Sequence, residues 1–75
     1  MKSLIEVTGP RAQVQAEAIA KHYSTKAFSE DGTWYVECNK ELEEAMCMDE
    51  EDFFNAITEV EAATGVKINA DDICF

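Results

Sequence analysis

Residues 25–38 read TKAFSEDGTWYVEC, and this stretch predicts a β-hairpin around which the rest of the fold can be arranged. Asp31-Gly32 lies between two apolar runs, and glycine accepts the positive φ that a tight hairpin turn requires. We expect Thr25–Phe28 to form the first strand, Ser29–Gly32 the turn and Thr33–Cys38 the second strand. Side chains alternate along a strand, so the second strand should present one apolar face, made of Trp34, Val36 and Cys38.

The segments before the hairpin predict a strand followed by a helix. Residues 3–8, SLIEVT, alternate in the way of a half-buried strand, with Ile5 and Val7 on one face. Gly9-Pro10 ends this strand, and proline suits the first turn of a helix because its missing N–H is not needed there. Residues 11–23 are rich in helix formers.

The segments after the hairpin predict two helices and a last strand. Asn39 is a plausible N-cap for a short helix over residues 40–47, and Asp49 for a second helix that ends at Gly65. A single helix broken near Met48 is the alternative. We expect residues 66–69 to form the last strand, followed by a turn at 70–72 and an apolar tail at 73–75.

The predicted order is therefore strand, helix, strand, strand, helix, strand, in one domain that spans residues 1–75. This order is typical of the α+β class and of the ferredoxin-like, or split βαβ, arrangement, in which two helices cover one face of an antiparallel sheet. The short extra helix near 40–47 is the main departure from it. The predicted core comprises Ile5, Val7, Ile19, Trp34, Val36, Phe53, Ile57 and Val60.

Charge is concentrated in one part of the chain. The net charge is −10, and residues 28–64 contain twelve acidic residues but only one basic residue, Lys40. Nucleic acids and anionic membranes are attracted by positive charge, so neither is expected to be a direct partner. Basic proteins and metal ions remain as candidate partners. The apolar fraction, 47%, is ordinary for a globular domain and argues against disorder.

The cysteines and the hydropathy pattern indicate a reduced, cytoplasmic protein. The three cysteines are odd in number and widely spaced, unlike the even set of a small secreted scaffold. We therefore expect no disulfide. No run approaches the roughly 20 apolar residues of a membrane helix, and the N-terminal apolar run is too short for a signal peptide.

No motif in the sequence indicates catalysis, a metal site or a cofactor. An EF-hand loop needs oxygen ligands at alternate positions around a central glycine, and residues 49–52 do not provide this. Cys38, Cys47, Cys74 and His22 lack the short spacings of a zinc site. No base is near Cys47 in the sequence, and neither a nucleophile elbow nor a phosphate-binding loop occurs. We expect a protein that is not an enzyme.

The most informative stretch for function is Glu41–Phe54, ELEEAMCMDEEDFF, half of which is acidic. Such a dense charge repels itself, and an ordinary solvated helix face would mix charges of both signs. We therefore predict a partner-binding surface that includes the acids of this stretch, those of the hairpin turn and one exposed aromatic residue. Its predicted members are Glu30, Asp31, Tyr35, Glu41, Glu43, Glu44, Asp49, Glu50, Glu51 and Asp52.

Small size, high acidity and a plain α+β fold together resemble the small inhibitors that phages and plasmids make against nucleic-acid-handling host systems. This is a similarity of type, carried by no matched motif. It implies a DNA-mimicking protein that occupies a basic surface. In such a complex we expect an exposed aromatic residue, Tyr35 or Phe54, to supply the anchoring contact. The alternative is a homo-oligomeric module, such as a homodimer, or an accessory module that associates through a sheet face or edge. That surface would use Leu4, Tyr35 and the tail 73–75, with the acids serving solubility alone.

Overall fold

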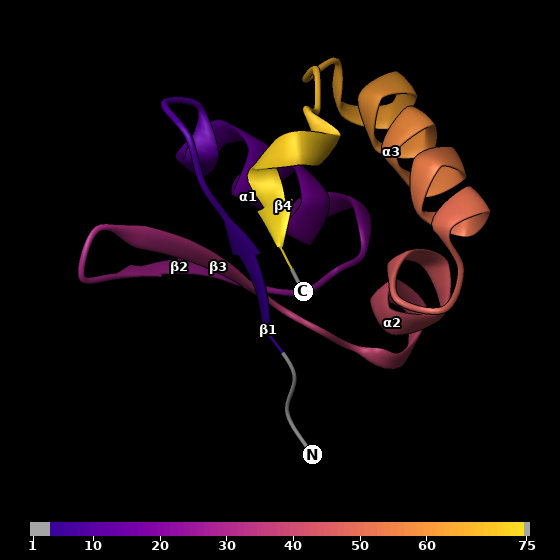
Figure 1. The fold of residues 1–75 in the computed structure, drawn as a ribbon, viewed down its shortest axis with the longest axis horizontal. Helices are drawn as coiled ribbons and strands as arrows, with labels where there is room; N and C mark the ends of the chain where they lie inside the picture. Colours follow the sequence, from indigo (N-terminus) through magenta and orange to yellow (C-terminus); the bar gives the residue numbers. More distant parts are fainter. Residues whose placement is uncertain (1–3, 75) are drawn as a thin grey trace.

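The computed structural model describes residues 4–74 and has an α+β architecture (Figure 1). Three α-helices accompany a four-stranded antiparallel sheet, so the predicted fold class is confirmed at this level. The elements are β1 (Leu4–Val7), α1 (Ala12–His22), β2 (Ala27–Glu30), β3 (Thr33–Glu37), α2 (Lys40–Met46), α3 (Glu50–Thr64), a 3₁₀ turn (Ala70–Asp72) and β4 (Ile73–Cys74).

The sheet has the strand order β2-β3-β1-β4, and each strand is antiparallel to its neighbours. Val36 of β3 lies opposite Ile5 of β1 and Ala27 of β2, which places these side chains on the inner face. Ile5, Val7 and Val36 are fully buried there. The alternation predicted for the first strand and for β3 is therefore confirmed.

The hairpin is confirmed, but its turn is shorter than predicted. Ser29 and Glu30 continue β2 and pair with Trp34 and Thr33, so only Asp31-Gly32 remains in the turn. Both turn residues have positive φ, 53° and 81°, as a two-residue hairpin turn requires. The first hairpin strand begins two residues later than predicted, at Ala27. The backbone N–H of Thr25 donates to the Ala20 carbonyl oxygen at 2.9 Å instead of to a strand, and only its hydroxyl reaches the Glu37 carbonyl oxygen, at 2.7 Å.

The predicted strand at residues 66–69 is wrong, and the true fourth strand is Ile73–Cys74. The backbone N–H groups of the earlier segment donate to side chains instead of to a strand. The N–H of Ile68 donates to Glu61 Oε2 at 2.8 Å, and that of Asn69 to Gln15 Oε1 at 2.7 Å. The expected turn at 70–72 is a 3₁₀ turn. Phe75, the last residue of the expected tail, lies outside the described residues.

The helices pack into one core with the inner face of the sheet. Helix α1 contacts β1, β2 and β3, whereas α3 packs chiefly against α1 and α2. The predicted core is confirmed for all residues except Trp34, which is half-buried at the core's edge. None of the helices within residues 4–74 is long and apolar enough to cross a membrane.

The helix boundaries follow from capping. Helices α2 and α3 are separate, and each begins at the predicted N-cap: Asn39 Oδ1 accepts from the Leu42 N–H at 2.8 Å, and Asp49 Oδ1 from the Glu51 N–H at 3.0 Å. Helix α3 ends at Gly65, whose φ of 75° is a left-handed conformation that glycine adopts without strain. Helix α1, Ala12–His22, is one residue shorter at each end than the predicted helix 11–23.

Candidate partner-binding surface

Except for the half-buried Glu61, which accepts from the Ile68 N–H, the acidic side chains of α2 and α3 face solvent. They are held there because each helix buries its other side, Leu42 and Met46 in α2 and Phe53, Ile57 and Val60 in α3. The exposed acids on or at the ends of these helices include all seven that the sequence predicted there: Glu41, Glu43, Glu44, Asp49, Glu50, Glu51 and Asp52.

Acids also begin both helices for a local reason. Glu41 and Glu43 lie in the first turn of α2, and Glu50, Glu51 and Asp52 lie in the first turn of α3. The unpaired N–H groups at a helix N-terminus carry partial positive charge, which stabilises carboxylates there. No basic residue lies in the last turn of either helix. Local stabilisation therefore lets the chain keep a dense acidic surface on two short helices.

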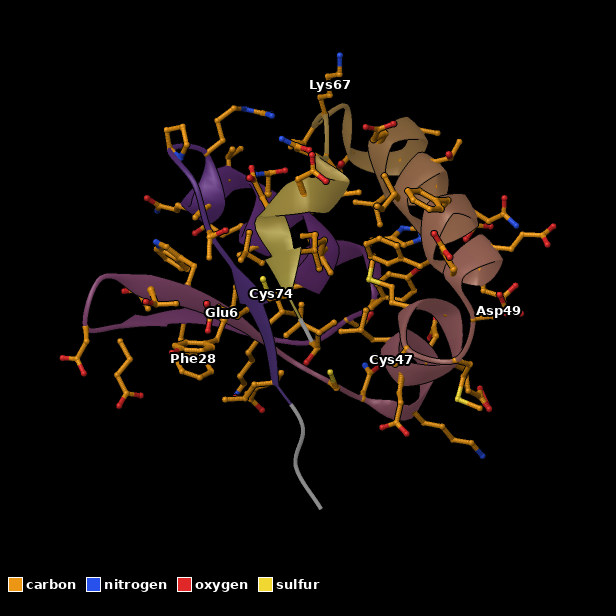
Figure 2. All side chains as sticks on the ribbon, viewed as in Figure 1. Glu6, Phe28, Cys47, Asp49, Lys67 and Cys74 are labelled. Atoms are coloured by element: carbon orange, nitrogen blue, oxygen red, sulfur yellow. The ribbon has the colours of Figure 1, made fainter. Side chains whose placement is uncertain are left out.

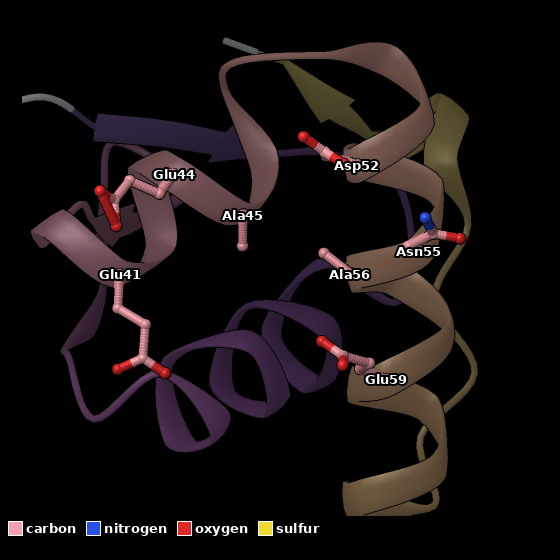
Figure 3. A pocket seen from close by; sticks show the side chains of 7 residues that line it. All are labelled: Glu41, Glu44, Ala45, Asp52, Asn55, Ala56 and Glu59. Atoms are coloured by element: carbon pink, nitrogen blue, oxygen red, sulfur yellow. The ribbon is translucent and has the colours of Figure 1, made fainter.

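Some of these acids line a groove of about 400 Å³ between α2 and α3. Asp52 and Glu59 point from α3 towards α2, whereas the Glu44 carboxyl group points away from α3 (Figure 3). We call it the α2–α3 groove. The α2 side contributes Glu41, Glu44 and Ala45, and the α3 side contributes Asp52, Asn55, Ala56 and Glu59. Four carboxyl groups and no basic side chain line it, so the groove suits a cationic group.

A buried tyrosine at the end of α1 is influenced electrostatically by two of these acids. Tyr23 caps the C-terminus of α1 and is only 3% exposed, yet its hydroxyl has no hydrogen-bond partner. Burial raises the pKa of Tyr23, and the carboxylates of Glu59 and Glu41 raise this pKa further. Both carboxylates line the groove, one on each side, at the end nearest α1 (Figure 3). The hydroxyl therefore lies within electrostatic reach of both walls.

An apolar site adjoins the acids at the junction of the two helices. Met46, Cys47, Met48 and Phe53 line a second hollow of about 330 Å³, together with Asp49 and Glu50. Met48 is 71% exposed and Phe54, the next residue after Phe53, is 49% exposed. Exposed apolar side chains surrounded by charge are the usual anchors of a protein interface.

Three of the predicted surface residues lie apart from this acidic region. Glu30 and Asp31 are exposed near the tip of the β2–β3 hairpin, which extends away from α2 and α3 (Figure 1). Tyr35 lies on the outer face of the sheet and stacks on Phe28 at 5.5 Å between ring centroids. The predicted single surface is therefore divided among two helices, a hairpin tip and a sheet face.

The outer sheet face carries a row of side chains that crosses all four strands. Phe28 pairs with Tyr35, Tyr35 with Glu6, and Glu6 with Cys74. Figure 2 shows Phe28, Glu6 and Cys74 following one another across the sheet. Leu4, on the same face, is 43% exposed. Three of the residues in the alternative interface, Leu4, Tyr35 and Cys74, thus share one face, whereas Ile73 is buried.

The sequence prediction missed Glu59 and Tyr23. Asp52, Asn55 and Glu59 recur at spacings of three and four residues, which places them on one side of α3. The same spacing joins Glu41 to Glu44 and Ala45 on α2. This periodicity could have identified both walls of the groove, but not that the two walls form one groove. Nothing in the sequence indicates that Tyr23, at the end of the predicted helix 11–23, leaves its hydroxyl unpaired.

The acids and thiols of the described residues can be compared with the requirements of a metal site. Within residues 4–74, no three histidine, cysteine or acidic side chains are placed to hold a metal ion. All three cysteines are free, and the Cys47 thiol influences that of Cys38. Burial and the neighbouring Cys47 raise the pKa of Cys38 to about 11, which keeps this thiol protonated and unreactive at neutral pH.

Comparisons of the chain with protein-family models, with curated proteins and with solved structures found no significant match.

Proposed function

We propose that this chain is a small, non-enzymatic binding protein that occupies a basic surface of a protein partner, in the manner of a nucleic-acid mimic. The observation that carries the proposal is the α2–α3 groove and the exposed acids around it. Four carboxyl groups from two helices line one groove, and the described residues that line it include no base. A charge arrangement of this kind attracts lysine and arginine side chains and repels nucleic acid.

The physical basis is competition for a basic site. Duplex DNA carries one negative charge per about 1.7 Å of helix axis, and proteins bind it through lysine and arginine. Acids three or four residues apart on a helix lie about 5–6 Å from each other and present a comparable array. Two helices joined by only three residues, 47–49, bring two such arrays together.

Charge would supply rapid, oriented association, and apolar contact would supply most of the affinity. Peripheral charges act mainly on the association rate, whereas buried anchors control dissociation. Phe54 and Met48 fit the anchor role because they are exposed on or beside the acidic helices. Tyr35, the other predicted anchor, is on the outer face of the sheet, so Phe54 is the better supported of the two.

The experiment is affinity capture from the native host with the wild-type chain and a charge-reversed variant, Glu43→Lys/Glu44→Lys, followed by kinetics with the partner recovered. Wild type should retain a basic protein that salt elutes, and the variant should associate about tenfold more slowly at low salt. Duplex DNA should compete if the occupied surface is a nucleic-acid site.

The matched control is Glu17→Lys/Asp71→Lys, which changes the net charge equally at two exposed residues outside α2 and α3. Asp72 is unsuitable as a control because its carboxylate accepts a hydrogen bond from Gln15 Nε2 at 3.0 Å. Equal association rates for wild type and both variants would refute the proposal and leave the acids as a solvated surface.

The second candidate is self-association through the outer face of the sheet. The stacked Phe28–Tyr35 pair and exposed Leu4 favour it, because apolar side chains on an open sheet face are typical of interfaces. The acids Glu6 and Glu37 share this face, however, and a symmetric dimer would bring acidic residues of two copies close together. A mass in solution of one chain at high protein concentration would exclude this candidate.

We also propose the ferredoxin-like assignment for the fold. Helix α1 connects β1 to β2, and β3 lies between these two strands in the sheet. Helices α2 and α3 connect β3 to β4, and β1 lies between those two strands. Each βαβ unit is thereby split by a strand of the other. An experimental structure with a different strand order would remove this assignment.

A further inference from the structure

We propose that the outer face of the sheet is a second binding surface, which takes an arginine side chain from a basic segment of a protein. In the complex the guanidinium lies against the Tyr35 ring and donates hydrogen bonds to the Glu6 carboxylate. This surface is separate from the acidic helices α2 and α3, so the proposal goes beyond the proposed function and does not depend on it.

The outer face carries an aromatic pair on a side of the sheet that the helices do not cover. The helices pack on the inner face, where Ile5, Val7 and Val36 are fully buried. On the outer face Phe28 and Tyr35 stack with ring centroids 5.5 Å apart, and both remain half-buried. Apolar side chains scattered singly over a surface are ordinary, whereas neighbouring ones on an open face are typical of a binding surface.

Glu6 places a negative charge beside this aromatic pair. It lies on β1 directly opposite Tyr35 of β3, whereas Phe28 lies opposite Tyr35 on the other side, in β2. Directly opposite residues of antiparallel strands have Cβ atoms about 4.5–5.5 Å apart. The carboxylate is therefore within reach of a cation that contacts the Tyr35 ring. Glu6 is half-buried, so water screens its charge less than that of a fully exposed acid.

The charge of the face selects a cationic occupant. Within the described strands, the side chains of the outer face include three acids, Glu6, Glu30 and Glu37, and no base. Lys26, one residue before β2, is an exposed basic residue beside them. The face of an aromatic ring also attracts a cation, through the negative charge of its π-electrons. Rings and carboxylates on this face thus favour the same kind of ligand.

Arginine fits these groups better than lysine does. Its planar guanidinium stacks on aromatic rings, is weakly hydrated and presents five N–H donors, so it can contact Tyr35 and donate to Glu6 at the same time. A lysine ammonium is a compact, strongly hydrated charge that meets the ring without stacking on it. Leu4 precedes Glu6 by two residues on the same face and is 43% exposed, so it can contact the apolar part of the arginine side chain.

Two other occupants are disfavoured by the same charges. Single-stranded RNA stacks its bases on aromatic residues of a sheet, but its phosphates require basic surroundings. A second copy of the chain would bring Glu6, Glu30 and Glu37 of each copy towards those of the other. Charge complementarity therefore leaves a basic protein segment as the occupant.

The test uses NMR with the full chain and short peptides in a Gly/Ser background. The peptides carry arginine, lysine or citrulline at the same positions, citrulline being a neutral analogue of arginine. At low salt the arginine peptide should shift the ring signals of Tyr35 and the amide signal of Glu6, and leave the amide signal of Ile19 in the core unchanged. It should bind at Tyr35 more tightly than the lysine peptide, and the citrulline peptide should not bind there measurably.

Three variants separate the ring and the carboxylate from the general negative charge. Tyr35→Leu keeps an apolar side chain but removes the ring, and binding followed at the Glu6 amide should weaken by roughly threefold to tenfold. Glu6→Gln should weaken binding followed at the Tyr35 ring by a similar factor. The control Glu51→Gln removes the same charge from an exposed position on α3 and should weaken it by about twofold or less. Unchanged amide signals of Ile19 and Val60 show that each variant is folded.

The proposal is overturned if the arginine peptide leaves the Tyr35 signals unshifted, if lysine or citrulline peptides bind equally well, or if Glu51→Gln weakens binding as much as Glu6→Gln. It is also overturned if a uridine oligonucleotide shifts the Tyr35 ring signals, which would indicate an RNA surface. Shifts of these signals when the chain alone is concentrated would indicate a second copy instead. None of these results bears on the proposed function, which is judged by the association rate of the Glu43→Lys/Glu44→Lys variant with the whole partner.

Discussion

Gln15 shows how one polar residue can hold the C-terminal part of the chain. It is fully buried in α1, and both ends of its amide are used. Its Nε2 donates to Asp72 Oδ2 at 3.0 Å, and its Oε1 accepts from the Asn69 N–H at 2.7 Å. The amide therefore fixes the segment that leads into β4, which has only two residues and cannot hold itself by strand pairing alone.

We predict that Gln15→Leu lowers the free energy of unfolding by about 1–3 kcal/mol, because it leaves the Asp72 carboxylate and the Asn69 N–H without partners. Urea unfolding measures this change. Gln13→Leu, at an exposed position two residues earlier in the same helix, should change the free energy by about 0.5 kcal/mol or less. Similar losses in both variants would show that the hydrogen bonds of Gln15 do not secure this segment.

Cys38 makes stability depend on pH at the alkaline end. Its pKa in the folded chain is raised from the ordinary 9.0 to about 11, chiefly by burial. Between these two values the unfolded chain loses the thiol proton and the folded chain keeps it. The contribution of the protonated Cys38 thiol to the free energy of unfolding is therefore fully present below about pH 9 and is lost as the pH rises towards 11.

We predict that raising the pH from 8 to about 10.5 destabilises wild type more than Cys38→Ser, since serine does not titrate in this range. Denaturant unfolding of both proteins at each pH gives the comparison. The raised pKa of Tyr23 acts in the same direction at the upper end of the range and is common to both proteins. An equal loss of stability in the two proteins would contradict the role of Cys38.

At the scale of elements, the features that the sequence predicted correctly are those with local causes. The hairpin follows from Asp31-Gly32, α3 from the Asp49 N-cap and Gly65, and α2 from the Asn39 N-cap. In each case the deciding residue stabilises a backbone conformation within a few positions of itself. Such local signals can be read from the sequence because they do not depend on contacts with distant residues.

The features that the sequence did not predict depend on contacts between distant residues. Residues 66–69 have the alternation of a strand, but the side chains of Glu61 and Gln15 take their N–H groups. The short β4 exists because β1 offers a free edge beside Val7. The groove likewise requires the relative placement of two helices, so its acids could be predicted individually but not as the lining of one groove.

Only one of the two adjacent phenylalanines of α3 packs into the core, beside Ile57 and Val60. Phe53 is 9% exposed, whereas Phe54 is 49% exposed. We predict that Phe53→Ala lowers the free energy of unfolding by about 3–5 kcal/mol, because it leaves a cavity beneath the helix. Phe54→Ala should lower it by about 1 kcal/mol or less. Thermal melts measure both changes, and a larger effect at Phe54 would mean that α3 is rotated relative to the structure described above.

Over the whole molecule, the fold separates charge from core. The acids of α2 and α3 lie on one part of the surface, the hairpin tip adds Glu30 and Asp31, and the net charge is −10. The molecule measures only 30 × 30 × 21 Å, so all these charges act on one another. A compact, highly charged domain of this size is destabilised by self-repulsion.

We therefore predict that salt stabilises the protein. Between about 0.01 M and about 0.1 M salt the screening length falls from about 30 Å, the width of the molecule, to about 10 Å. The melting temperature should rise by several degrees, since 1 kcal/mol corresponds to roughly 4–8 °C for a domain of this size. The Glu43→Lys/Glu44→Lys variant, with less repulsion to screen, should melt at a higher temperature in low salt and respond less to added salt. A melting temperature that falls as salt is added would mean that attractive ion pairs outweigh repulsion, and that the acids are already neutralised within the chain instead of being available to a basic partner.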